Sequence, residues 1–194
     1  MFSRIFKLSL IFSFLYGAST QSLLSQNTSP GDSLSLGLAV PTTEIGQPYI
    51  AERIGDWNLR CIRTQDGNDP CELTQVLINE QNEPVSEVTL FKLPAGQPAV
   101  AGANVIVPLE TLLNAPLIIA FDDQNTRQYP YSFCTSIGCI ARIGLTEEDI
   151  ALMKKGLVAD IIISHLSLPN QKVGFALSLK GFTAAYEKAT VIEN

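Results

Sequence analysis

The chain has 194 residues, carries a formal net charge of −6 at pH 7, and is 46% hydrophobic and 16% charged. Nucleic acid is excluded as a partner, because phosphate backbones are bound by clustered cations and the sequence has no run of Lys or Arg. Anionic membrane surfaces are disfavoured for the same reason. With one His and all four cysteines expected to be oxidised, the usual zinc or iron ligand sets cannot be assembled, so no metal or other cofactor is expected.

The first residues have the organisation of a secretory signal peptide. Two cations, Arg4 and Lys7, precede the apolar run Leu8–Tyr16, and small residues follow. We expect cleavage after Ala18 or Ser19, so that the signal peptide ends at residue 19. A retained membrane anchor is the alternative, but the apolar run is shorter than the about 20 residues that a spanning helix needs. The expected location is therefore the periplasm, the outer membrane or the medium, with no transmembrane segment after cleavage.

The rest of the chain divides into a leader and one domain. Residues 20–48 are rich in Ser, Thr, Gln, Gly and Pro and poor in aromatic residues, which is typical of a flexible leader. We expect the folded domain to cover residues 49–190, a length within the usual range for a single hydrophobic core.

The four cysteines indicate two disulfides, because their number is even and the signal peptide directs the chain to an oxidising compartment. Three connectivities are possible. We favour Cys61 with Cys71 and Cys134 with Cys139, because each pair is close in sequence and brackets turn-forming residues.

Short runs of β-branched and aromatic residues, separated by turn residues, dominate the domain. This spacing predicts a mainly β, antiparallel β-sandwich or barrel-like single domain, since parallel strands need longer crossover connections. Hairpin turns are expected at 122–125 and 168–171. The expected strands are 57–63, 71–78, 87–93, 105–107, 117–121, 128–133, 139–143, 158–165, 173–179 and 182–186.

One short α-helix interrupts this pattern. Thr146 is a good N-cap with Asp149 three residues on, and Gly156 suits a left-handed stop. We expect the helix to cover an open end or edge of the sheets with the face formed by Ile150, Met153 and Leu157.

The sequence holds few candidates for catalysis. His165 ends an apolar run and is expected to be structural. The Cys134–Cys139 loop is the strongest enzymatic alternative, as a thiol-disulfide enzyme of the envelope, but its spacing differs from the two-residue redox motif. Asp66, Asp69 and Glu72 miss the standard calcium-loop pattern, so we interpret them as a solvated acidic turn. The Asp122-Asp123 pair is likewise assigned to turn chemistry.

The order of several short motifs carries more information than any one of them. They are Gly55-Asp56-Trp57, Cys71-Glu72-Leu73, Val107-Pro108-Leu109, Tyr131-Ser132-Phe133-Cys134 with Gly138-Cys139, and Gly181-Phe182-Thr183-Ala184-Ala185. In this order the set closely resembles the invasion-associated locus B family, from about Tyr49 to Tyr186.

The resemblance implies a small exported protein of Gram-negative bacteria, from a family named for a locus that contributes to the invasion of host red cells. It brings no catalytic residues with it. The family's recurrent positions would be core and turn determinants, namely the four cysteines, Trp57, Pro108, Gly138, Gly181 and Phe182.

The first functional hypothesis is a non-enzymatic protein that contributes to invasion or envelope interactions by binding an envelope partner or a host surface. The alternatives are the thiol-disulfide enzyme and a structural or stress-related envelope protein without a dedicated ligand.

Overall fold

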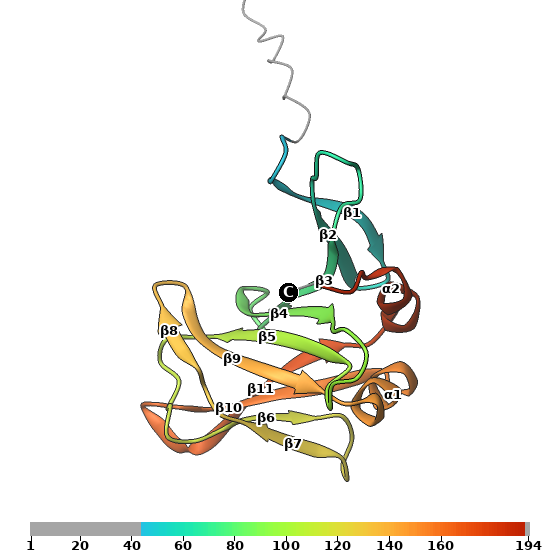
Figure 1. Ribbon diagram of the computed structural model, residues 1–194. Helices are drawn as coiled ribbons and strands as arrows, with labels where there is room; N and C mark the ends of the chain where they lie inside the picture. The colour runs from blue at the N-terminus through green and yellow to red at the C-terminus, as the bar shows by residue number, and fades with distance from the viewer. Residues whose placement is uncertain (1–43, 193–194) are drawn as a thin grey trace, which may run out of the picture. The chain divides into compact units, whose positions relative to one another are not determined.

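The computed structural model describes residues 44–192. The predicted signal peptide and most of the predicted leader therefore lie outside the described residues. Two antiparallel sheets and two helices form the domain (Figure 1). The strands are β1 (Pro48–Ile54), β2 (Trp57–Ile62), β3 (Cys71–Ile78), β4 (Pro84–Lys92), β5 (Ala101–Val107), β6 (Leu117–Ala120), β7 (Thr126–Tyr129), β8 (Phe133–Thr135), β9 (Gly138–Leu145), β10 (Val158–His165) and β11 (Leu168–Ser178), and the helices are α1 (Glu147–Lys155) and α2 (Phe182–Lys188).

The two sheets stack as the layers of an open sandwich. The larger has seven strands in the order β1-β2-β3-β4-β5-β9-β8, and the smaller has four in the order β11-β10-β6-β7. Every strand pairing is antiparallel, which confirms the predicted fold class. In Figure 1 the helices lie together at one end of the layers, and β8 lies at the other.

Alternation of side chains along each strand builds the core. In β2, Trp57, Leu59 and Cys61 are buried while Asn58 and Arg60 face outward, as the period-2 pattern predicts. Residues of both sheets contribute to a single apolar cluster, which includes Leu90, Val105, Ile161, Ile163 and Leu177. Because both layers bury one face against the other, the outer faces are left for contacts with solvent or partners.

Helix α1 begins as predicted but ends differently. Thr146 and Asp149 form a capping box, and Ile150 and Met153 are buried against the core. Gly156 is extended, with φ −74° and ψ 167°, so the predicted left-handed stop is wrong. Leu157 is 82% exposed, because the chain has already left the helix and turned into β10.

The predicted final strand over 182–186 is wrong, since these residues form α2. Ala184 and Ala185 are strong helix formers, and the buried residues Phe182, Ala185 and Ala189 follow a helical spacing. Gly181 adopts φ +83° at the N-terminus of this helix.

Three further elements differ from the prediction. β1 was not predicted as a strand. The predicted strand 128–133 is two strands, β7 and β8, because Pro130 has no backbone N–H with which to continue a ladder. The predicted turn at 168–171 lies instead at Leu166 and Ser167, and β11 begins at Leu168. The predicted turn at 122–125 is confirmed, since it joins β6 to β7.

A candidate binding groove on the outer sheet face

The outer face of the seven-stranded sheet carries a groove of about 610 Å³. We call it the outer-face groove. Because β2, β3, β4, β5, β8 and β9 all contribute, it combines segments that are far apart in the sequence. Its lining residues are Arg60, Glu72, Glu87, Thr89, Asn104, Ile106, Phe133, Ile137, Ile140 and Arg142.

One side of the outer-face groove is a charged network centred on Arg60. Its guanidinium lies 2.8 Å from Glu72 Oε1 and 3.3 Å from Glu87 Oε1. It also donates a hydrogen bond to Thr89 Oγ1 at 3.3 Å. Arg142 is exposed in the same groove, and no ion pair forms on it within residues 44–192. A second arginine is thus available there to an anionic group of a partner.

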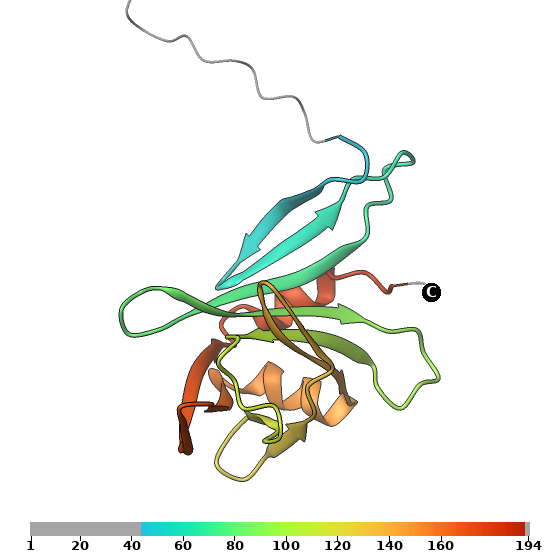
Figure 2. The ribbon, with the colours of Figure 1, turned by 90° about the vertical axis from the view of Figure 1, so that its left-hand side faces the viewer.

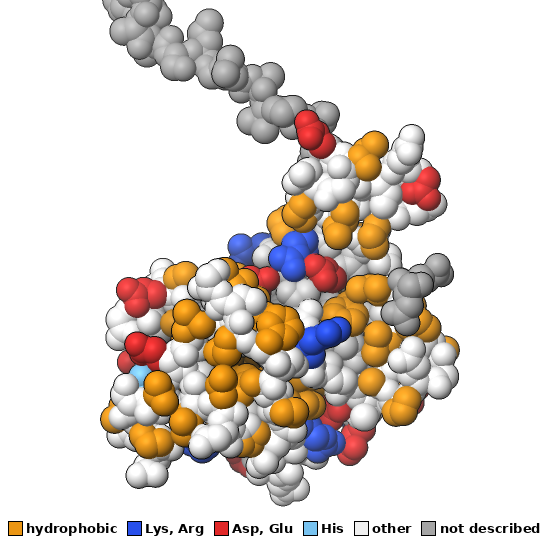
Figure 3. All heavy atoms as spheres, turned by 60° about the vertical axis from the view of Figure 1, so that its left-hand side comes forward, with side chains coloured by type: hydrophobic (Ala, Val, Ile, Leu, Met, Phe, Trp, Pro, Cys, Tyr) orange, Lys and Arg blue, Asp and Glu red, His pale blue; other side chains and the backbone are white. Residues whose placement is uncertain are grey.

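The other side of the outer-face groove is apolar. Phe133 is 51% exposed and Ile137 is 73% exposed, and both lie beside the half-buried Ile106 and Ile140. Figure 3 shows hydrophobic side chains gathered on this side of the molecule, with charged side chains of both signs above them. Exposed apolar groups next to organised charges are typical of a contact surface.

The Cys134–Cys139 disulfide holds the edge of this groove. It joins β8 to β9 as a directly opposed pair, and the Cys61–Cys71 disulfide joins β2 to β3 in the same way. This is the local connectivity expected from the short loops. Gly138 has φ +150°, and a Cβ there would lie 2.4 Å from the Val107 carbonyl oxygen. The turn can therefore lie this close to β5 only with glycine at the position.

The acidic residues around the first disulfide loop are not brought together as a calcium site. Asp69 accepts hydrogen bonds from the Tyr49 hydroxyl at 2.6 Å and the Thr64 backbone N–H at 2.7 Å. Asp66 is bonded to Asn68, and Glu72 faces the outer-face groove. Within residues 44–192, no cluster of three or more His, Cys, Asp or Glu side chains is arranged to hold a metal ion.

The hydrogen bond from Tyr49 holds the pKa of Asp69 below its ordinary value, with further contributions from Thr64 and Arg63. A lowered pKa in the folded protein means that the ionised carboxylate stabilises the fold at neutral pH. This stabilisation is fully present above the ordinary carboxyl pKa and is lost as the pH falls through the lowered one.

We therefore expect Asp69→Asn to be less stable than the wild type at neutral pH. The difference between the two proteins should shrink as the pH falls below the ordinary aspartate range. Urea unfolding followed at a series of pH values measures this dependence. A stability difference that stays constant down to the lowest pH measured would contradict the assigned role of the carboxylate.

His165 is the last residue of β10 and makes two polar contacts. Its Nε2 is 3.0 Å from Glu110 Oε2, and its Nδ1 accepts a hydrogen bond from the Ser167 backbone N–H at 3.2 Å. The first contact joins the end of β10 to the loop that follows Pro108, and the second lies within the β10–β11 turn. The Pro108 carbonyl accepts a 2.6 Å hydrogen bond from Thr111 Oγ1, which tightens that loop. These contacts fit the structural role expected for His165.

Two glycine motifs from opposite ends of the domain meet in space. A Cβ on Gly55 would lie 2.3 Å from the Lys180 carbonyl oxygen, and a Cβ on Gly181 would lie 2.5 Å from the Ile54 carbonyl oxygen. Trp57 and Phe182 follow these glycines, are fully buried, and have ring centroids 5.4 Å apart. The two motifs therefore join the start of the large sheet to α2.

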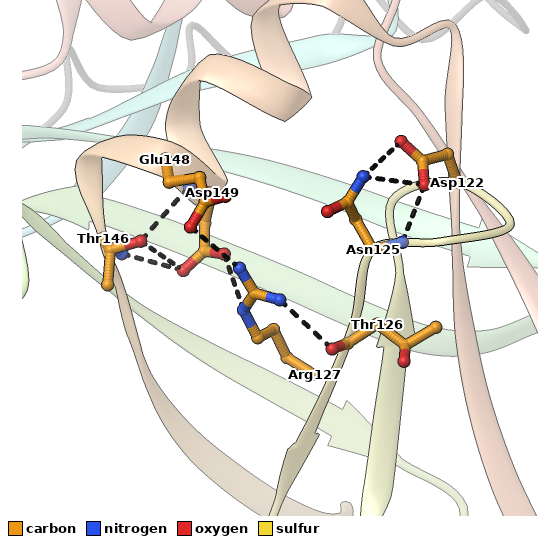
Figure 4. Close-up of polar contacts among 7 residues, drawn as sticks. All are labelled: Asp122, Asn125, Thr126, Arg127, Thr146, Glu148 and Asp149. Atoms are coloured by element: carbon orange, nitrogen blue, oxygen red, sulfur yellow. Dashed lines mark hydrogen bonds and ion pairs between the residues drawn. The ribbon is translucent and has the colours of Figure 1, made fainter.

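A further polar cluster fixes α1 to the β6–β7 hairpin (Figure 4). Arg127 of β7 lies 3.0 Å from the buried carboxylate of Asp149 and 3.3 Å from the exposed Glu148. Asp122 accepts hydrogen bonds from the backbone N–H groups of Gln124 and Asn125, which is the turn chemistry expected for it. This cluster positions elements and presents no acid-base pair.

Sequence reasoning did not find the outer-face groove. Cys134 and Cys139 were named as a disulfide, but Arg60, Phe133, Ile137 and Arg142 were not identified as binding residues. A usable signal was the alternation within the strands, which assigns Arg60 and Arg142 to outward positions. The pairing order that gathers them was not available from that alternation.

Comparisons with known proteins agree with one another. The sequence profile described as "Invasion associated locus B (IalB) protein" matches residues 57–190. Two proteins of Brucella abortus named as invasion protein B homologues, one from strain 2308 and one from biovar 1, are each 26% identical over 147 residues, which covers 74% of this chain and 80% of theirs.

A solved structure shares the fold. The crystal structure of invasion associated protein B from Bartonella henselae superposes with a TM-score of 0.60 at 22% identity, covering 71% of this chain and 93% of that one. Since the profile match covers more than half of the sequence, including the four cysteines, Trp57 and the Gly181-Phe182 pair, this chain belongs to the invasion associated locus B family.

Proposed function

We propose that this protein is exported to the periplasm, the outer membrane or the medium, and that it contributes to invasion or envelope interactions by binding rather than by catalysis. Membership of an invasion-associated family supports the general role. The charged and apolar start of the sequence and the two disulfides support export to an oxidising compartment. Within residues 44–192 no helix is long and apolar enough to cross a membrane.

The observation that carries the binding proposal is the outer-face groove. It places exposed Phe133 and Ile137 beside the exposed cation Arg142, on the face that the core does not use. Aromatic and arginine side chains dominate binding energy at protein interfaces, because they combine large contact area with directed hydrogen bonds. The matching partner is a protein surface with an apolar centre and an acidic group.

A pull-down with a matched control tests this surface. The immobilised mature protein is incubated separately with the envelope fraction of its own bacterium and with erythrocyte membranes. We expect Phe133→Ser with Ile137→Ser to reduce capture of the partner about tenfold, as loss of central apolar contacts does elsewhere. Leu157→Ser is the control, because Leu157 is 82% exposed and follows α1, at the other end of the sandwich from β8 in Figure 1.

Each result has a distinct meaning. Equal capture by the groove variant and the wild type would contradict the assignment of the surface. If the wild type captures no protein from either fraction, the result would favour the structural envelope protein without a dedicated ligand.

Export is tested separately by mass spectrometry of the native protein, which should begin after Ala18 or Ser19. An intact N-terminus would contradict export.

Thiol-disulfide exchange is a second candidate function, favoured by one observation. Cys134 is exposed beside the outer-face groove while its partner Cys139 is buried, so one sulfur is open to attack. The test is the oxidation of a model dithiol by the wild type and by Cys134→Ala with Cys139→Ala, in which the model dithiol becomes a disulfide as the Cys134–Cys139 disulfide is reduced to two thiols. Activity that disappears only in this double variant would support exchange, and equal activity would remove it.

A further inference from the structure

Strand β11 forms an edge of the four-stranded sheet and pairs only with β10 among the described strands. The Leu179 backbone N–H donates to the Leu157 carbonyl at 2.9 Å, so residues 157 and 179 form a hydrogen-bonded pair. The register of β10 and β11 continues from this pair, with Leu177 opposite Ala159. Odd-numbered residues of β11 therefore direct their backbone groups to β10, and even-numbered residues direct theirs outward. The outward residues of the regular part of the strand are Lys172, Gly174, Ala176 and Ser178.

One end of this edge is already closed. The Gln75 side chain donates to the Ser178 carbonyl at 2.9 Å and accepts from the Ser178 N–H at 2.8 Å, so it substitutes for a neighbouring strand. No such contact forms within residues 44–192 on the outward backbone groups of Lys172, Gly174 and Ala176. A Cβ on Gly174 would have no atom within 4 Å. Three residues thus offer a ready template for another strand.

The other sheet edges are protected against such pairing. β1 begins with Pro48, has a bulge between Ile50 and Glu52, and carries charged side chains. β7 has four residues and β8 has three, so neither offers a long ladder. β11 has 11 residues, and Figure 2 shows it at the side of the molecule.

We propose that β11 pairs with β11 of a second copy of this chain, antiparallel and around a two-fold axis at Gly174. Gly174 then faces Gly174 of the second copy, and Lys172 faces Ala176 of the second copy. The two four-stranded sheets become one continuous sheet of both copies. A contact on this edge leaves the outer-face groove of the other sheet open, so the dimer and the proposed binding function stand independently.

Charge complementarity argues for a second copy as the occupant. Asp160 of β10 lies directly beside Ala176, on the same sheet face. Strands are about 4.8 Å apart, so Lys172 of the second copy would lie about 10 Å from Asp160 between Cα atoms, with only the small Ala176 between them. A lysine side chain spans this gap. Because of the two-fold symmetry, the ion pair between Lys172 of one copy and Asp160 of the other occurs twice in the dimer.

The lysine must change its direction for this contact. In the single copy its Nζ donates to Ser164 Oγ at 2.8 Å, which uses one of its three N–H groups. Asp160 is exposed and has no ion-pair partner within residues 44–192. Because the paired segment is short, we expect a weak dimer whose population rises with protein concentration.

Crosslinking through a single new cysteine tests the register. All four native cysteines are in disulfides, so an added thiol is the reactive one. Opposed residues of a hydrogen-bonded pair have Cα atoms about 5.5 Å apart, within disulfide range. Gly174→Cys should therefore form a covalent dimer under mild oxidation. Ala176→Cys is the matched control, because the two cysteines would be about 13 Å apart along the strands and should not crosslink.

Charge exchange tests the ion pair. Sedimentation velocity of the full mature chain should show a dimer whose dissociation constant rises roughly tenfold or more in Lys172→Glu, since two attractions become repulsions. Adding Asp160→Lys to that variant should restore the dimer, whereas Lys155→Glu on α1 should have no effect. A monomer at every concentration, equal crosslinking at positions 174 and 176, or failure of the charge exchange to restore the dimer would overturn the proposal.

Discussion

Gly181→Ala is expected to lower the free energy of unfolding by about 3 kcal/mol or more. Two costs combine at this position. Gly181 has φ +83°, which side-chain-bearing residues rarely adopt, and its new Cβ would lie 2.5 Å from the Ile54 carbonyl oxygen. The backbone of β1 would have to move away, and with it the packing of Trp57 on Phe182.

Gly67→Ala separates the two costs. Gly67 has φ +79° but nothing within 4 Å of the position of its Cβ, so it carries the conformational cost alone, about 1 kcal/mol. Urea unfolding of both variants, followed by Trp57 fluorescence, measures the difference. Equal destabilisation of the two variants would show that the contact between Gly181 and β1 adds nothing.

Asp149→Ala is expected to lower the free energy of unfolding by about 3 kcal/mol, because it removes both one half of the capping box and a buried ion-pair partner. The Asp149 side chain is 2% exposed, lies 3.0 Å from Arg127, and accepts a 2.9 Å hydrogen bond from the Thr146 N–H. Without it, the Thr146 N–H loses its partner in the capping box and α1 loses its ion pair with Arg127 of β7 (Figure 4).

Glu148→Ala is the matched control, since Glu148 pairs with the same arginine but its side chain is 71% exposed. Exposed ion pairs contribute about 0–1 kcal/mol, so this variant should remain close to the wild type. A double-mutant cycle between Arg127→Ala and Asp149→Ala isolates the ion pair from the cap. A coupling energy of zero would mean that Asp149 acts only through the capping box.

Only part of the candidate site can be predicted from the alternation of side chains along its strands. Alternation within β2 and β9 places Arg60 and Arg142 outward, and this much follows from the residues alone. Their common location depends on four strand pairings between β2 and β9. Nothing local specifies those pairings, because many short antiparallel strands of similar composition have equivalent pairing rules.

The capping box of α1 and the mainly β class were determined by the sequence itself, and the disulfide pairing that it favoured is the one that the structure has. These features depend on residues close in the chain, such as Cys61 with Cys71, Cys134 with Cys139, and Thr146 with Asp149. Only the tertiary structure decided that 182–188 is a helix, that Gly55 meets Gly181, and that the β11 edge stays open. These features depend on contacts between distant segments, and burial of Phe182 and Ala185 against such segments outweighs the local strand pattern.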